Sequence, residues 1–197
     1  RVFDRAVLVT VMRAEHASSP IRERVLERAK ARSRVINQNV ASLYYFGEWN
    51  ARPTIVSELV AGDDLPAFVA QHKGRLPLDI AFDIIEQTLR GLEALHAQGA
   101  PHGGLRPSSV RITPQMRVVV TELAVELPAE VNGQGALMLA APWYAAPELV
   151  DRAAHGELPE PTIAGDIFAV GVLAYSLLTG FLPTALALAT SKQYRPP

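Results

Sequence analysis

The sequence contains no cysteine among its 197 residues. This absence excludes a disulfide scaffold, zinc sites built on thiolates, and enzymes that use a cysteine nucleophile or a CxxC redox pair. An excess of charge of one sign is also lacking, because 19 basic residues face 20 acidic ones. No overall field would draw the chain to nucleic acid or to an anionic membrane, and we expect neither as a partner.

A long hydrophobic run free of interruptions is also missing. Residues 167–191 form a stretch of 25 residues without a charge, which is long enough to cross a bilayer. Because Gly180 and Pro183 interrupt this stretch, we interpret it as a buried helix at about 166–179 followed by a loop. A transmembrane helix is the alternative. Residues 1–11 lack the apolar core and cleavage site of a signal peptide.

What is present is a globular composition, 49% hydrophobic, arranged in two parts of different character. The first part, residues 1–60, is rich in strand signals and contains one charged helix. The expected strands are 7–11, 42–48 and 53–59, and the expected helix is 21–34. Residues 7–11 have no polar face, which is typical of a strand covered on both sides.

The second part, residues 61–197, is mostly helical with one isolated hairpin. We expect helices at 65–72, 77–99 and 166–179, and a hairpin at 110–121. Asp64 is placed to cap the first of these helices and Gly99 to stop the second. The pattern predicts an α+β fold of two lobes, an arrangement that often holds a ligand between the lobes.

Three segments of the chain are similar to known motifs, in a fixed order. Residues 99–109 (GAPHGGLRPSS) are similar to H-R-D-L-K-P-x-N, with His102 and Pro107 among the matching positions. Ala146, Pro147 and Glu148 then match A-P-E. Residues 165–171 (GDIFAVG), which include Asp166 and Gly171, resemble a third motif, D-[IV]-[YW]-[SA]-x-G, which begins a buried helix in proteins that carry the other two.

Together these segments resemble a protein kinase domain, most closely the PknB-like bacterial serine/threonine kinases. Residues 3–12 resemble the approach to the third strand of that fold, and residues 56–62 resemble the hinge. The resemblance places the first two strands with their glycine-rich loop before residue 1, and the last helices after residue 197. It implies a nucleotide cleft with Ser57, Glu58, Val60 and Glu122 as candidate lining residues.

The resemblance also shows where the catalytic groups of a kinase should lie. The lysine of the third strand aligns with Thr10, and the helix glutamate falls near Arg28. The catalytic aspartate aligns with Gly104, and the asparagine that binds metal aligns with Ser109. We therefore expect no catalytic residue at these positions.

The D-F-G motif of the family corresponds to Glu122, Leu123 and Ala124. By contrast, the family's equivalents of His102, Glu148 and Asp166 hold loops and a helix in place. The resemblance therefore implies a pseudokinase: a signalling or scaffolding module that binds a protein partner, with weak or absent binding of ATP and magnesium. It further implies a cytoplasmic location, as the intracellular domain of a membrane-anchored protein, and a homodimer as one form of association.

Two other functions stay open at this level. A divergent kinase, or another phosphoryl or nucleotidyl transferase, could use Glu122 as a metal ligand. A nucleotide sensor could bind ATP without turnover. The His102-Gly103-Gly104 sequence also occurs in the oxyanion loop of lipases, but the chain has no G-x-S-x-G nucleophile motif.

The helix at 21–34 carries an unusual number of basic residues. Arg24, Arg28 and Arg32 are spaced to form one stripe along it. A solvated face is the simplest interpretation. One alternative is a binding surface for an acidic partner or a phosphopeptide. Nucleic acid is the weaker alternative, because no aromatic stacking platform accompanies the stripe.

Overall fold

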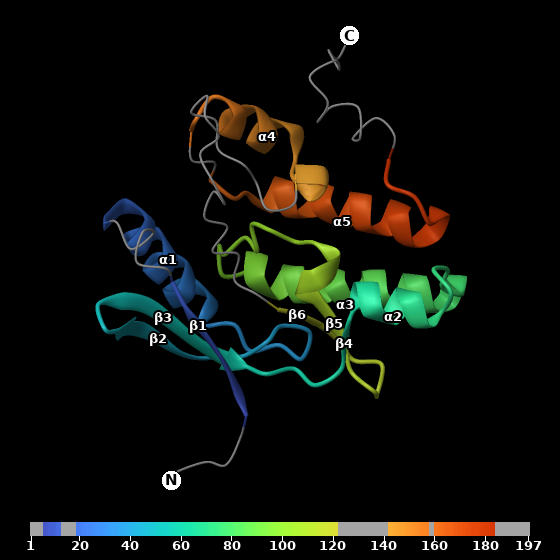
Figure 1. The fold of residues 1–197 in the computed structure, drawn as a ribbon, viewed down its shortest axis with the longest axis horizontal. Helices are drawn as coiled ribbons and strands as arrows, with labels where there is room; N and C mark the ends of the chain where they lie inside the picture. The colour runs from blue at the N-terminus through green and yellow to red at the C-terminus, as the bar shows by residue number, and fades with distance from the viewer. Residues whose placement is uncertain (1–5, 13–18, 122–141, 158–159, 184–197) are drawn as a thin grey trace.

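The computed structural model describes residues 6–12, 19–121, 142–157 and 160–183, which form two lobes (Figure 1). Each lobe contains a three-stranded antiparallel sheet in this part of the chain. The first sheet has the strand order β1-β3-β2 and the second has the order β4-β5-β6. The two-lobe α+β architecture predicted from the sequence is confirmed.

The small lobe consists of the first sheet and one helix. Its elements are β1 (Val7–Val11), α1 (Ser19–Arg32), β2 (Leu43–Trp49) and β3 (Arg52–Glu58). Asn50 and Ala51 join β2 to β3 with positive φ angles of 52° and 58°. Two left-handed residues in succession give a turn whose twist matches that of the flanking strands, so the expected hairpin forms.

Strand β1 is correctly predicted in position but not in environment. It pairs with β3 at the edge of the sheet, and Val9 is 52% exposed. Among the described residues, helix α1 covers only the end of this segment, where Met12 packs with Val25 and Ile55. The prediction of a strand covered on both sides is therefore wrong, because apolar composition reports hydrophobicity and not the neighbours that a strand acquires.

In the large lobe one long helix packs against the second sheet, and a second long helix packs against the first helix. Its helices are α2 (Leu65–Gln71), α3 (Leu78–His96), α4 (Pro147–Ala154) and α5 (Ile163–Thr179), with short 3-10 turns η2 (Pro107–Ser109) and η3 (Pro142–Tyr144). Its strands are β4 (Asp63–Asp64), β5 (Val110–Ile112) and β6 (Val118–Val120). Asp64 caps α2 as expected, since its Oδ1 accepts a hydrogen bond from the Ala67 amide at 2.9 Å.

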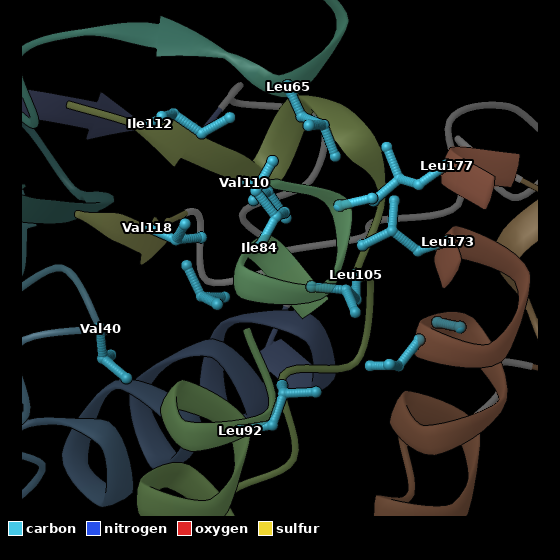
Figure 2. Close-up of a cluster of buried hydrophobic side chains, with 14 of the residues drawn as sticks. Val40, Leu65, Ile84, Leu92, Leu105, Val110, Ile112, Val118, Leu173 and Leu177 are labelled. Carbon is cyan, nitrogen blue, oxygen red and sulfur yellow. The ribbon is translucent and has the colours of Figure 1, made fainter. Parts of the chain in front are cut away.

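The main core lies where α3, α5 and the β5–β6 hairpin meet, and Figure 2 shows its side chains converging there. The most deeply buried members include Ile84 and Leu92 of α3, Val110 and Val118 of the hairpin, and Leu173 of α5. All five are aliphatic, so this core is held by close packing of apolar side chains. It fixes the hairpin and α5 relative to each other, and the loop between α3 and β5 lies beside them.

Residues just before β2 join the small lobe to this core. Asn39 is buried, and its Nδ2 donates to Val118 O at 2.7 Å and to Gln87 Oε1 at 3.0 Å. Gly91 of α3 permits this approach, because a Cβ there would lie 2.6 Å from Asn39 O. On the other side of the connection, Glu58 Oε1 lies 3.1 Å from Arg117 Nη2. The two lobes are thus joined by specific polar contacts as well as by the chain.

Helix α5 corresponds to the buried helix predicted from the uncharged stretch. It ends at Gly180, which adopts the left-handed conformation with φ of 80°. Across the parts of the chain that the structure describes, no helix is both long enough and apolar enough to span a membrane.

Candidate functional site

The side chain of Asp166 organises the loop that resembles a catalytic loop. Asp166 lies in the first turn of α5 and is 2% exposed. Its Oδ2 accepts from the His102 amide at 2.7 Å, and its Oδ1 accepts from the Gly103 amide at 2.8 Å. His96 Nε2, at the end of α3, lies 2.7 Å from the same Oδ2. One carboxylate therefore joins the start of α5, the end of α3 and the loop between α3 and β5.

The fixed position of α5 explains why this carboxylate is well placed. The helix begins at the N-cap Thr162, whose side chain accepts from the Gly165 amide at 2.9 Å. A carboxylate in the first turn is also favoured by the positive end of the helix dipole. The buried charge is compensated by three donors, which is the condition under which a buried carboxylate is tolerated.

His102 is buried and neutral. Its Nε2 lies 2.9 Å from Thr121 O, and because a carbonyl oxygen only accepts, Nε2 carries the hydrogen. Burial, and next the positive charge of Arg32, lower the pKa of His102 to about 4. The ring therefore links the loop to the end of the β5–β6 hairpin, and a histidine that is neutral and buried is not placed to act as a general base on solvent-exposed substrate.

The next positions in the loop carry no reactive side chain. Gly103 has φ of 79°, and a Cβ there would lie 2.5 Å from Pro161 Cβ, so any side chain at this position is strained. Gly104 stands where the family has its aspartate and offers no carboxylate. The Ser109 hydroxyl donates to Arg106 O at 2.8 Å and accepts from the Arg106 amide at 3.1 Å. Ser109 is thus occupied in closing η2, which begins at Pro107.

On the small-lobe side, the resemblance aligns the family's lysine–glutamate pair with Thr10 and Arg28. Thr10 lies on the same face of its strand as Met12, which packs against Val25 of α1. A threonine on that face is neutral and cannot balance phosphate charge. Arg28 of α1 stands near the position of the glutamate and lies 3.7 Å from Glu160, which precedes α5. The charge at this position is the reverse of the one that the family uses.

The three hinge candidates are only partly available to a ligand. The side chain of Glu58 is held by Arg117 and accepts from the Ser42 amide at 3.1 Å. Val60 is buried in a small cluster with Ala41 and Val119. Ser57 is half-buried in β3. The side chains of Glu58 and Val60 therefore make their contacts within the protein, which leaves them poorly placed to bind a ligand.

Of the remaining motif residues, three lie at the start of α4 and one lies within α5. Ala146 is the buried N-cap residue of α4, followed by Pro147 and an exposed Glu148 in the first turn. Gly171 lies on α5, where a Cβ would meet nothing within 4 Å among the described residues. The candidates Glu122, Leu123 and Ala124 lie outside the described residues.

Two residues at this site were missed or misread from the sequence. Arg106 falls opposite the lysine of the H-R-D-L-K-P-x-N pattern, and comparison of the two strings would have found this retained cation. Arg32 is 3% exposed, so the interpretation of the arginine stripe as a solvated face is wrong at that position. No local signal distinguishes Arg32 from its exposed neighbours, because its burial depends on packing against the large lobe.

The described part of the site can hold a loop firmly but presents little chemistry. It offers no carboxylate at the position of a catalytic base. Within the described residues, no group of three or more His, Cys, Asp or Glu side chains is placed to hold a metal ion. The groups that are retained are those that hold the backbone of the loop between α3 and β5 in position.

We predict that Asp166→Ala lowers the free energy of unfolding by about 3 to 5 kcal/mol, because two buried backbone donors and His96 lose their acceptor. For a chain of this size the melting midpoint should fall by roughly 6 to 20 °C in calorimetry. Asp151→Ala on the exposed surface of α4 is the control and should cost less than about 0.5 kcal/mol. A loss below about 1 kcal/mol for Asp166→Ala would contradict the anchoring role.

The lowered pKa of His102 predicts a loss of stability in acid. The unfolded chain, with a histidine pKa near 6.5, binds a proton before the folded chain does, so stability falls as the pH drops from 6.5 towards 4. Between pH 7 and pH 5 this residue should contribute a loss of about 2 kcal/mol. Urea denaturation at the two pH values should therefore show a loss of unfolding free energy in His102→Gln that is smaller than the wild-type loss by that amount. His155→Gln, at an exposed histidine, should behave as the wild type. Equal losses in the wild type and His102→Gln would refute the assignment.

Comparison with known proteins places this geometry in a family. A family profile described as protein kinase domain matches residues 4–195. The serine/threonine-protein kinase PknA of Mycobacterium tuberculosis is 31% identical over 189 residues, which cover 92% of this chain and 42% of that protein. A Lactococcus lactis protein described as probable serine/threonine-protein kinase PknB is 29% identical over 183 residues, covering 91% of this chain and 28% of the relative. The chain thus spans less than half the length of these curated relatives.

The fold is matched among solved structures as well. The crystal structure of the PknI kinase domain of Mycobacterium tuberculosis superimposes with a TM-score of 0.71 at 18% identity, covering 97% of this chain and 68% of that one. Identity at that level speaks for the fold alone. Since the family profile matches nearly the whole sequence and the relatives are bacterial serine/threonine kinases, this chain belongs to the protein kinase domain family.

Proposed function

We propose that this chain is a pseudokinase domain, which binds a protein partner in the cytoplasm and does not transfer phosphoryl groups. The observation that carries the proposal is Gly104 in a loop whose supports are complete. Asp166 and His102 position that loop, yet the residue that should accept the substrate proton has no side chain. Removing one general base alone typically lowers a rate by 10²- to 10⁴-fold.

The small-lobe residues support the same proposal. Phosphoryl transfer depends on positioning and on balancing the charge of the phosphates, which the family does with a lysine–glutamate pair and magnesium. Thr10 supplies no charge, and Arg28 supplies the wrong one for holding a lysine. The losses at Thr10, Arg28 and Gly104 concern different parts of the machinery, so no single substitution would restore it.

The scaffold that remains suits a binding role. Its loop, helix α5 and hairpin are fixed by buried hydrogen bonds and by an aliphatic core, so this part of the chain presents a surface of defined shape. A rigid surface can bind a partner without a large loss of conformational entropy. We therefore propose that the partner is a protein, and we expect weak or absent binding of ATP and magnesium.

The proposal is tested by thermal unfolding of the full protein that contains this domain, with and without ATP and magnesium at constant ionic strength. No shift above about 1 °C is expected at about 5 mM ATP, whereas a dissociation constant of about 50 µM would raise the midpoint by roughly 5 to 11 °C. A shift that requires magnesium would contradict the proposal and favour a transferase that uses Glu122.

Two variants show where any nucleotide effect arises. Ser57→Phe fills the back of the hinge, so it should abolish a shift that comes from the cleft. Arg32→Met removes a buried positive charge of α1 away from the hinge. It should abolish a shift that arises because the phosphates of ATP bind at that charge. A shift that is lost in Ser57→Phe and kept in Arg32→Met would be nucleotide binding in the cleft and would count against the proposal.

A further inference from the structure

A pocket of about 200 Å³ lies between α1 and the loop that follows α3. Arg28 and Arg32 line it from α1, and Leu95 lines it from the end of α3. Residues Gly99 to His102 close its other side. None of the hinge residues 57–60 lines this pocket.

The pocket contains a buried positive charge, two of whose three nitrogens lack a hydrogen-bond acceptor among the described residues. Arg32 is 3% exposed, and its Nε and Nη1 have no hydrogen-bond partner within the described chain. Burial lowers the pKa of Arg32 only to about 10, so the guanidinium is charged at pH 7. A buried charge without acceptors is strongly unfavourable, and such groups in proteins are normally paired.

His102 adds a second unmet requirement in the same pocket. Its Nε2 donates to Thr121 O, so Nδ1 carries the lone pair and is an acceptor. This Nδ1 is buried and has no partner among the described residues. Arg32 and His102 both line the pocket, and the positive charge of Arg32 is one cause of the lowered pKa of His102. The pocket therefore needs an occupant that accepts from Arg32 and donates to His102.

We propose that this pocket binds a small oxyanion of the phosphate class, either free phosphate or the phosphoryl group of a small phosphomonoester. At pH 7 hydrogen phosphate carries charged oxygens that accept from a guanidinium and an O–H group that can donate to an imidazole nitrogen. A chloride ion has no donor, and a carboxylate has none when ionised. Pockets for drug-sized ligands occupy about 300 to 1,000 Å³, so this one suits a smaller molecule.

The charges around the pocket support an anion but limit its affinity. Arg28 and Arg32 contribute two positive charges, and Glu27 at the exposed rim contributes one negative charge. The lining residues are therefore net positive by one charge, with His102 neutral. Just outside the lining, Glu160 lies 3.7 Å from Arg28, and Asp166 accepts from the His102 amide. A bound anion would connect α1 of the small lobe to the loop of the large lobe, so its effect should be measurable as stability. The site does not depend on whether the chain transfers phosphoryl groups.

The experiment compares the wild type with two variants that each remove one positive charge from α1. Arg32→Met replaces the buried cation, and Lys30→Met removes an exposed charge from the same helix outside the pocket. The melting midpoint of the full protein is measured as inorganic phosphate replaces chloride at constant ionic strength. At ten times the dissociation constant, the wild type and Lys30→Met should rise by about 3 to 6 °C in a saturable manner.

Arg32→Met should show less than about 1 °C of this response while unfolding cooperatively without phosphate, because an apolar side chain of similar length suits a buried site. Glu27→Gln should bind phosphate more tightly than the wild type, since a negative charge at the rim is removed. Replacing phosphate by glycerol phosphate separates the two sources: a larger response to the ester assigns phosphomonoesters, and a smaller one assigns free phosphate.

Three results would overturn the proposal. The first is the absence of any saturable phosphate response in the wild type. The second is an equal response in the wild type, Lys30→Met and Arg32→Met, which would indicate a general salt effect. The third is a phosphate response that appears only in Glu122→Gln. Glu122 follows Thr121 in the chain, so this result would mean that the carboxylate of Glu122 already fills the pocket in the wild type.

Discussion

The carboxylate of Asp166 is the interaction on which the rest of this site depends. It is buried at the start of α5 and accepts hydrogen bonds from the amides of His102 and Gly103. Because α5 is held in the aliphatic core, the carboxylate transmits the position of that core to the loop. His102 then extends the connection to Thr121 at the end of the second hairpin. A loop with no regular secondary structure of its own is thereby given one conformation.

This arrangement separates two properties that a kinase combines. Backbone positioning is carried by buried groups, Asp166 and His102, and these are complete. In the family, charge and proton transfer are carried by groups facing the cleft, and the resemblance aligns these positions with Thr10, Arg28 and Gly104. Since stability depends on the first set and chemistry on the second, the proposed loss of the reaction is compatible with the family's fold. The orphaned charge of Arg32 lies outside both sets, which is why it points to a different ligand.

Most of the fold could be predicted from local patterns, and the motifs located the site. The hairpin of β2 and β3, the Asp64 cap and the stop at Gly180 follow from turn and cap chemistry that acts over a few residues. The exposure of β1, the burial of Arg32 and the insertion of Asn39 beside Gly91 could not be predicted, because each depends on contacts between segments distant in the sequence. Whether the D-F-G position retains chemistry stays a prediction, since Glu122 lies outside the described residues.

The most direct test of the central claim is single-turnover transfer of the labelled γ-phosphoryl group from ATP, measured with excess full-length protein, magnesium and a protein substrate. With Thr10 and Gly104 in place of the lysine and the aspartate, we predict no label above that found with heat-denatured protein. Label that appears in the wild type and disappears in Glu122→Gln would contradict the account, because it would show that the domain still transfers phosphoryl groups through that carboxylate.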